Sequence, residues 1–141
     1  MKMAVRRGAA TLVLATLCGG VLLAHHSFAM YDQSKPVVIK GTVTRFRWIN
    51  PHALLSIAAE PRPGDAALTW VLELSSPGNL TRAGWTRASV KPDDRVEVAF
   101  YPMKDGSRGG ACVKVTFAAS GRSLDCLAGA AIRVGEKPNL P

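Results

Sequence analysis

The stretch Leu68–Gly84, which reads LTWVLELSSPGNLTRAG, changes from a strand pattern to a helix pattern near its middle. Every second residue of its first half is leucine or tryptophan, and this period of two is typical of a strand with one buried face. Ser76 and the proline after it form an N-cap and first-turn pair, and Gly84 lies where a short helix would end. The stretch therefore predicts a strand with Trp70 facing inward, followed by a helix over Pro77–Ala83.

Strand patterns continue on both sides of this stretch. Residues with high β-propensity predict a long first strand over Pro36–Ile49, bent at Gly41, and a second strand over Ala53–Ala59. Alternating apolar residues predict a fourth strand over Val96–Phe100 and a fifth over Val113–Phe117. Turn-forming residues predict loops at Asn50–His52, Glu60–Asp65, Lys91–Asp94 and Pro102–Gly110, and a hairpin turn at Ser120-Gly121.

Three strands, a short helix and two further strands follow one another in the chain order of the OB-fold, a five-stranded Greek-key barrel. The sequence therefore predicts an all-β domain with one short helix, folded as a small five-stranded OB-fold-like barrel. A β-sandwich or an open barrel with the same strands is the alternative. OB-fold barrels bind ligands on strands 2 and 3 and on the loops that join strands 1 to 2 and 4 to 5. In this chain those loops are Asn50–His52 and Pro102–Gly110.

The start of the chain has the pattern of a signal peptide. Three basic residues within the first eight positions precede an uncharged run over Ala9–Ala24, which is shorter than the about 20 apolar residues of a typical membrane span. Small Ala24 suits the position before the cut, and Ala29 is an alternative position. We therefore predict a signal peptide over 1–24, one barrel domain over 25–128 and a loosely held tail over 129–141. The expected location is periplasmic or secreted, without a permanent membrane span.

Charge narrows the class of partner. The full chain has a net charge of +8, which falls to about +5 after the predicted cut because residues 1–24 contain three bases and no acid. A basic exported domain favours anionic partners such as lipid headgroups, acidic glycans or small anions. Export argues against nucleic acid as the partner. The alternative is that this scattered charge only keeps the protein soluble.

Cys112 and Cys126 are the two cysteines that remain after the predicted cut, and an even number in an oxidising compartment suggests a disulfide. If Ser120-Gly121 is a two-residue hairpin turn, however, Cys126 lies opposite Val115. Three residues of strand then place it roughly 10 Å from Cys112, beyond the limit of about 7 Å between bridged Cα atoms. A disulfide requires the chain to leave this hairpin after Leu124. The sequence leaves both arrangements open.

Three blocks of sequence form a distinctive set: HHSFAMYD at His25–Asp32, WINPHA at Trp48–Ala53 and SPGNLTRAGWTR at Ser76–Arg87. Together they resemble a family of small exported bacterial proteins of unknown function, and the similarity extends over nearly all of the chain after residue 24. The resemblance implies an envelope location and a compact β domain, and it implies no activity. Cys112 and Cys126 do not belong to the family pattern.

His25, His26 and His52 are the only histidines of the chain. If the cut follows Ala24, His25 offers both its α-amino nitrogen and a ring nitrogen, a chelating pair that suits Cu(II). His26 or His52 would complete a set of nitrogen ligands, and such a set favours copper. Loss of the protons that compete with the metal costs little near neutral pH. The sequence therefore predicts a copper site formed by these three histidines. The alternative is an N-terminus without metal and a His52 that forms hydrogen bonds within its own loop.

A second hypothesis places the ligand at the mouth of the barrel. Trp48 lies beside one predicted binding loop, and Lys104 and Arg108 lie in the other. Stacking and charge from these side chains would hold an anionic or aromatic small molecule or a glycan. The alternative is that Trp48 fills the core together with the other two tryptophans.

The sequence contains no convincing motif of a catalytic site. Ser75 and Ser76 have no histidine and acid in a triad arrangement near them, and Ser76 is explained as a helix cap. Glu73 is predicted to face solvent, and Gly106–Gly110 joins two strands instead of a strand and a helix, unlike a phosphate-binding loop. We therefore predict no enzyme activity, but a binding or accessory protein whose partner is a metal ion, a small molecule or an envelope protein. The sequence does not indicate the oligomeric state.

Overall fold

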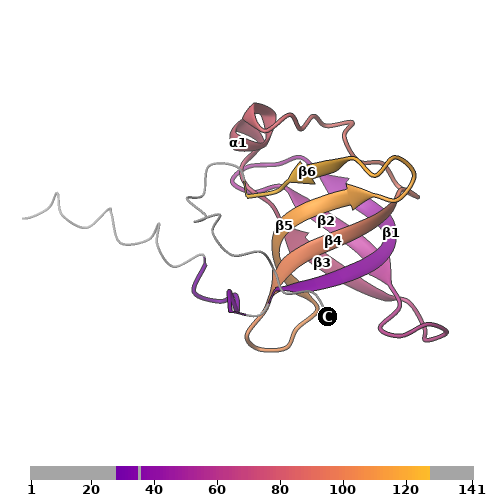
Figure 1. The fold of residues 1–141 in the computed structure, drawn as a ribbon. Helices are drawn as coiled ribbons and strands as arrows, with labels where there is room; N and C mark the ends of the chain where they lie inside the picture. Colours follow the sequence, from indigo (N-terminus) through magenta and orange to yellow (C-terminus); the bar gives the residue numbers. More distant parts are fainter. Residues whose placement is uncertain (1–27, 35, 128–141) are drawn as a thin grey trace, which may run out of the picture.

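A computed structural model describes residues 28–34 and 36–127 (Figure 1). The predicted signal peptide (1–24), His25 and His26, and the predicted tail (129–141) lie outside these residues. Within the described part, no helix has the length and apolar character needed to cross a membrane. Its elements are β1 (Val37–Arg47), β2 (Leu54–Ala59), β3 (Leu68–Glu73), α1 (Pro77–Arg82), β4 (Arg95–Pro102), β5 (Gly109–Phe117) and β6 (Ser123–Asp125).

The first five strands form a closed barrel, which confirms the predicted all-β fold. Their order is β3-β2-β1-β4-β5, and a parallel pairing between β3 and β5 closes the ring. β1 pairs with β4 through its first half and with β2 through its second half, and it changes partner next to Gly41, where the sequence predicts a bend. A Cβ at Gly41 would overlap the Ala58 carbonyl and the Ile57 side chain, so the glycine lets β2 cross closely. This connectivity is that of an OB-fold-like Greek-key barrel.

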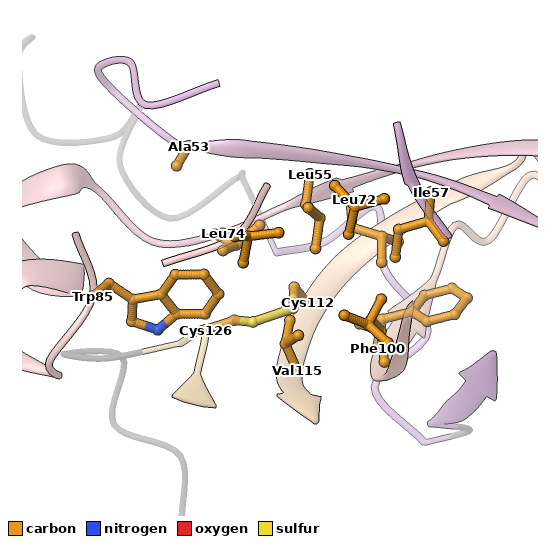
Figure 2. Close-up of a cluster of buried hydrophobic side chains, with 14 of the residues drawn as sticks. Ala53, Leu55, Ile57, Leu72, Leu74, Trp85, Phe100, Cys112, Val115 and Cys126 are labelled. Atoms are coloured by element: carbon orange, nitrogen blue, oxygen red, sulfur yellow. A yellow bond between two sulfur atoms is a disulfide. The ribbon is translucent and has the colours of Figure 1, made fainter. Parts of the chain in front are cut away.

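The core fills the barrel with the inward residues of each strand. Alternate positions of β2 and β4 are buried, as the period-two patterns predict, whereas the first four residues of β5 are all buried. Trp70 lies partly buried against this core, with its ring centroid 5.5 Å from that of Phe100. Trp85 is 1% exposed and donates a hydrogen bond of 2.8 Å from its indole nitrogen to the Asp125 carbonyl. Figure 2 shows core side chains that include Leu55, Ile57, Leu72, Leu74, Phe100 and Val115.

The helix begins and ends close to where the sequence predicts. The Ser76 hydroxyl accepts a hydrogen bond of 3.3 Å from the Asn79 amide, which confirms the predicted N-cap. The helix ends at Arg82, and Gly84 follows with a φ of 87°, a left-handed conformation that glycine adopts without strain. Leu80 faces the core and is fully buried. The helix therefore covers one end of the barrel (Figure 1).

Cys112 and Cys126 form a disulfide, with 5.5 Å between their Cα atoms. The prediction of a two-residue turn at Ser120-Gly121 is wrong. The Phe117 amide donates to the Arg122 carbonyl, so the hairpin loop has four residues. This shift moves the register by two residues, so that the Cys126 amide donates to the Val113 carbonyl and Cys126 lies beside Cys112. Both cysteines are fully buried among the core side chains (Figure 2).

The start of β5 and the number of strands also differ from prediction. The predicted loop Pro102–Gly110 is shorter in the structure, because β5 already begins at Gly109. A Cβ at Gly110 would overlap the Phe100 ring and the Tyr101 carbonyl, so this glycine belongs to a tightly packed strand and not to a loop. β6, which pairs with β5 after the hairpin, is a sixth strand that the sequence does not predict.

Candidate functional site

The carboxylate of Glu73 joins two distant segments at the end of β3. Nδ1 of His52 contacts its Oε1 atom, and the Tyr31 hydroxyl donates a hydrogen bond of 2.9 Å to its Oε2 atom. Glu73 faces outward from the barrel, between Leu54 of β2 and Ala111 of β5 in the sheet. The predicted outward direction of Glu73 is confirmed, but its side chain is only 31% exposed, because both its oxygens have partners from other segments.

The sheet itself positions His52 next to Glu73. Ala53 extends the β2–β3 pairing beyond the strands, because its amide donates to the Ser75 carbonyl and its carbonyl accepts from the Leu74 amide. Ala53 is fully buried, so the end of the loop is fixed in the core. His52 directly precedes this anchored residue, and its side chain therefore lies over the outward face where β3 ends. The loop before it contains a cis peptide bond between Asn50 and Pro51.

Tyr31 reaches the site from a segment that we call the strap, Phe28–Asp32. The strap lies against the loop Met103–Arg108, which we call the β4–β5 loop. Tyr31 forms an antiparallel bridge with Met103, flanked by a bond of 2.8 Å from the Asp32 amide to the Pro102 carbonyl and one of 2.9 Å from the Lys104 amide to the Met30 carbonyl. The Lys104 ammonium donates a further bond of 2.8 Å to the Ala29 carbonyl. The strap is therefore a short addition to the barrel wall.

Tyr31 is the buried member of the site. It is 5% exposed, and its ring meets that of Phe28 edge-on with 6.0 Å between centroids. Burial raises the pKa of the Tyr31 phenol above its usual value, and the hydrogen bond and negative charge of Glu73 raise this pKa further. The phenol therefore stays neutral and acts as a hydrogen-bond donor to the carboxylate.

The contact with Glu73 determines which ring nitrogen of His52 can bind a ligand. An ionised carboxylate only accepts hydrogen bonds, so Nδ1 carries the proton in this contact and Nε2 keeps its lone pair in the neutral ring. Histidines that ligate metals typically donate their other ring N–H to a carboxylate in this way. The His52 side chain is 39% exposed, which leaves the ring accessible. In the described residues, no group of three or more His, Cys, Asp and Glu side chains is arranged for a metal ion.

Only one of the three predicted metal ligands, His52, falls within the described part of the chain. His25 and His26 precede Phe28 and lie outside it. The structure nevertheless places the strap, which begins two residues after His26, on the same carboxylate as His52. The described geometry thus connects the N-terminal side of the chain to the loop that contains His52.

The residues predicted for a ligand at the barrel mouth have separate surroundings. Trp48 packs against the core with its ring centroid 5.8 Å from that of Phe46, and its carbonyl accepts a bond of 3.4 Å from Arg87. Lys104 holds the strap, and the Arg108 carbonyl accepts from the Val71 amide of β3. Lys104 and Arg108 share one loop, whereas no hydrogen bond between described residues joins either of them to Trp48.

Sequence reasoning missed Glu73 and Tyr31 as site residues. The alternation of β3 correctly places Glu73 on the outward face, but it contains no information on what covers that face. The signal would have been the pairing of Glu73 with Leu54, two residues beyond His52, and this requires the β2–β3 register, which the strand patterns alone do not give. Tyr31 lies within the first of the three family blocks and had no assigned role.

The fold and site define a small OB-fold-like barrel protein whose N-terminal side is docked beside a carboxylate–histidine pair. Residues 13–113 match the model of a family of unknown function, DUF6152, and the chain belongs to this family, which confirms the resemblance noted from the sequence. The matched span includes the strap, His52, Glu73 and the β4–β5 loop, and it ends before Cys126. Neither the curated proteins nor the solved structures compared with the chain include a match.

Proposed function

We propose that this protein is an exported metal-binding protein that holds one copper ion between His52 and the histidines at its mature N-terminus, His25 and His26. The observation that carries this proposal is the shared carboxylate of Glu73, which contacts both His52 and Tyr31. His26 precedes Tyr31 by five residues, and an extended chain of that length spans about 17 Å. The N-terminal histidines are therefore within reach of the His52 ring.

The chemistry of the ligand set favours Cu(II). After a cut behind Ala24, His25 supplies an amine and a ring nitrogen that chelate one ion, and Nε2 of His52 supplies a nitrogen from the barrel. Glu73 orients the His52 ring through Nδ1, and loss of such a partner typically changes metal affinity by about 10–100-fold. Nitrogen ligands in a tetragonal arrangement favour copper over the other divalent ions.

The disulfide supports the exported location that the proposal requires. Disulfides form and persist in oxidising compartments such as the bacterial periplasm, and they are rare in the cytosol. Cys112 and Cys126 are bonded in the barrel core. The apolar run at the start of the chain supports the same location, and we propose a periplasmic or secreted protein that a peptidase releases after Ala24.

Less supports the alternative of a small molecule or glycan at the barrel mouth. The Lys104 ammonium already bonds to the Ala29 carbonyl, and Trp48 packs against Phe46. These side chains would have to leave their present partners to hold an anionic or aromatic ligand. The metal site requires no such rearrangement, because Nδ1 of His52 keeps its contact with Glu73.

Titration of the exported protein with Cu(II) tests the proposal. We expect one equivalent to bind at micromolar concentration, His52→Ala to weaken this binding, and His25→Ala/His52→Ala to abolish it. Glu73→Gln should weaken binding by about 10–100-fold, because it removes the charge that orients the ring without removing a ligand. Lys114→Ala, on the exposed surface of β5, is the control and should bind like the wild type. Unchanged uptake by the His52 variant would exclude this site.

A further inference from the structure

We propose that the outward face of the barrel at the end of β1 binds the carboxylates of an acidic glycan through Arg45, Arg47 and Arg87, which we call the arginine surface. This inference goes beyond the proposed function and does not depend on a metal. The Phe46 ring packs against the core, with its centroid 5.8 Å from that of Trp85. Successive strand residues alternate between faces, so Arg45 and Arg47 point outward, and both are exposed.

Arg87 brings a third guanidinium to the same end of the strand. Its Nη1 atom donates a bond of 3.4 Å to the carbonyl of Trp48, the residue that follows Arg47. Side chains two residues apart on a strand are separated by about 7 Å along it. Arg45 and Arg47 therefore present two positive charges in line, and Arg87 adds one beside them. A linear array of this kind is complementary to a linear chain of negative charges.

The charges of the arginine surface are not neutralised within the described part of the chain. No ion pair between described residues includes Arg45, Arg47 or Arg87. Glu73 lies in the cross-strand row of Arg47, with Leu54 between them, but both its oxygens already have partners. The guanidinium groups therefore remain available for a bound anion, and each can hold a carboxylate through two parallel hydrogen bonds.

Two further acids, Asp93 and Asp94, lie in a turn that bonds to Val43 of β1. The Asp93 amide donates to the Val43 carbonyl, and the Asp94 carbonyl accepts from the Val43 amide, each over 2.9 Å. The Asp94 carboxylate accepts a bond of 2.8 Å from the Lys91 amide. This turn marks where the positive surface ends, so a bound polyanion would extend from Arg45 away from it.

The side chains beside the arginine surface favour a glycan over other polyanions. The outward positions of β2 and β3 are Leu54, Ser56, Ala58, Thr69, Val71 and Glu73, none of them aromatic. Single-stranded nucleic acids stack their bases on exposed aromatic rings, whereas Phe46 and Trp48 pack against the core. Proteins that lie on membranes insert large apolar side chains, whereas Leu54 is partly buried in the sheet. Short side chains instead leave room for sugar rings next to the guanidinium groups.

Binding of polygalacturonate tests this inference, with the protein recovered from its producing cells and a chelator present to remove metal. This polymer has one carboxylate per sugar, and its methyl ester is the uncharged control. We expect Arg45→Gln/Arg47→Gln to weaken binding by about tenfold, as for the loss of two exposed ion pairs. Arg62→Gln/Lys114→Gln removes the same charge from exposed positions elsewhere and should bind like the wild type.

Lysine substitutions separate the geometry of the arginines from their charge. Arg45→Lys/Arg47→Lys keeps both charges and removes the forked donors, so it should bind more weakly than the wild type and more tightly than Arg45→Gln/Arg47→Gln. Added salt should weaken binding of the wild type more than that of the glutamine variant, because salt screens exposed charges. Melting temperatures equal to that of the wild type would show that these surface variants remain folded.

The outcomes that overturn the inference are distinct from those that bear on copper. Absent binding, equal binding of the polymer and its methyl ester, or equal binding by the wild type and Arg45→Gln/Arg47→Gln would overturn it. An equal loss in Arg62→Gln/Lys114→Gln would show a general charge effect and would also overturn it. Binding to phosphatidylglycerol vesicles without binding to polygalacturonate would indicate a membrane partner instead. Because the assay contains no metal, each of these results leaves the proposed copper site standing.

Discussion

Tyr31 donates a hydrogen bond of 2.9 Å to Glu73 across a separation of 42 residues, and this bond fixes the strap to the end of β3. The second oxygen of the same carboxylate contacts His52. One side chain therefore holds together the strap, the third strand and the loop before β2. Removal of the Tyr31, Glu73 or His52 side chain should therefore change the surroundings of the other two.

Tyr31→Phe should lower the free energy of unfolding by about 1–2 kcal/mol, because it removes a largely buried hydrogen bond to a charged acceptor. Urea unfolding of the two proteins measures the difference. Tyr101→Phe, at a partly exposed position of β4, is the matched control and should have a smaller effect. Equal effects of the two substitutions would contradict the role assigned to the Tyr31 hydroxyl.

Alkaline pH should destabilise the wild type more than Tyr31→Phe. The pKa of Tyr31 is raised in the folded protein, so the stabilisation is complete below the unfolded value of about 10 and is lost as pH rises toward the folded value. Unfolding curves at pH 8 and at pH 11 measure the effect, and the difference between the two proteins should shrink at the higher pH. A difference that is constant with pH would show that the phenol is not protected.

Reduction of the Cys112–Cys126 disulfide should lower the free energy of unfolding by about 3 kcal/mol, as expected for a closed loop of this size. Thermal unfolding with and without reductant measures the loss. The double variant Cys112→Ala/Cys126→Ala should unfold at a lower temperature and should not respond to reductant. Wild-type protein that is insensitive to complete reduction would contradict a stabilising role for the disulfide.

Gly110→Ala should destabilise the barrel by about 1–3 kcal/mol, the usual cost of an overpacked core, because the new methyl group would overlap the Phe100 ring. Gly78→Ala is the matched control, since a Cβ at Gly78 meets no atom within 4 Å. Alanine is also the better helix former, so this control should be neutral or slightly stabilising. A comparison of melting temperatures distinguishes the two positions. Tolerance of alanine at Gly110 would contradict the close approach of β5 to β4.

The barrel could be predicted from sequence because each element has a local signal. The period of two from Leu68 to Glu73 reflects one buried face, and Ser76-Pro77 marks the start of the helix. Once the helix was placed between the third and fourth strands, few barrel topologies were compatible with the order of elements along the chain. The register of the last hairpin could not be predicted from a local signal, because Ser120-Gly121 indicates a turn without fixing the length of its loop. An error of two residues there was sufficient to separate Cys112 from Cys126.

The candidate site could be predicted only in part for a different reason. His52 was identified by its chemistry, since histidine is rare in this chain and binds metals well. Glu73 and Tyr31 act through a contact between segments that are far apart in sequence, and no local pattern encodes it. The outward direction of Glu73 followed from strand periodicity. That the strap covers this face depends on the bridge between Tyr31 and Met103, which only the folded chain reveals.

The intact mass of the protein recovered from its producing cells, measured under native conditions after exposure to Cu(II), tests the central claim most directly. The account predicts a chain that begins at His25 and contains one copper ion, and a His52→Ala variant that begins at the same residue and loses its copper at lower concentrations of a competing chelator. A chain that begins elsewhere, or a His52→Ala variant that retains its copper as well as the wild type, would contradict it.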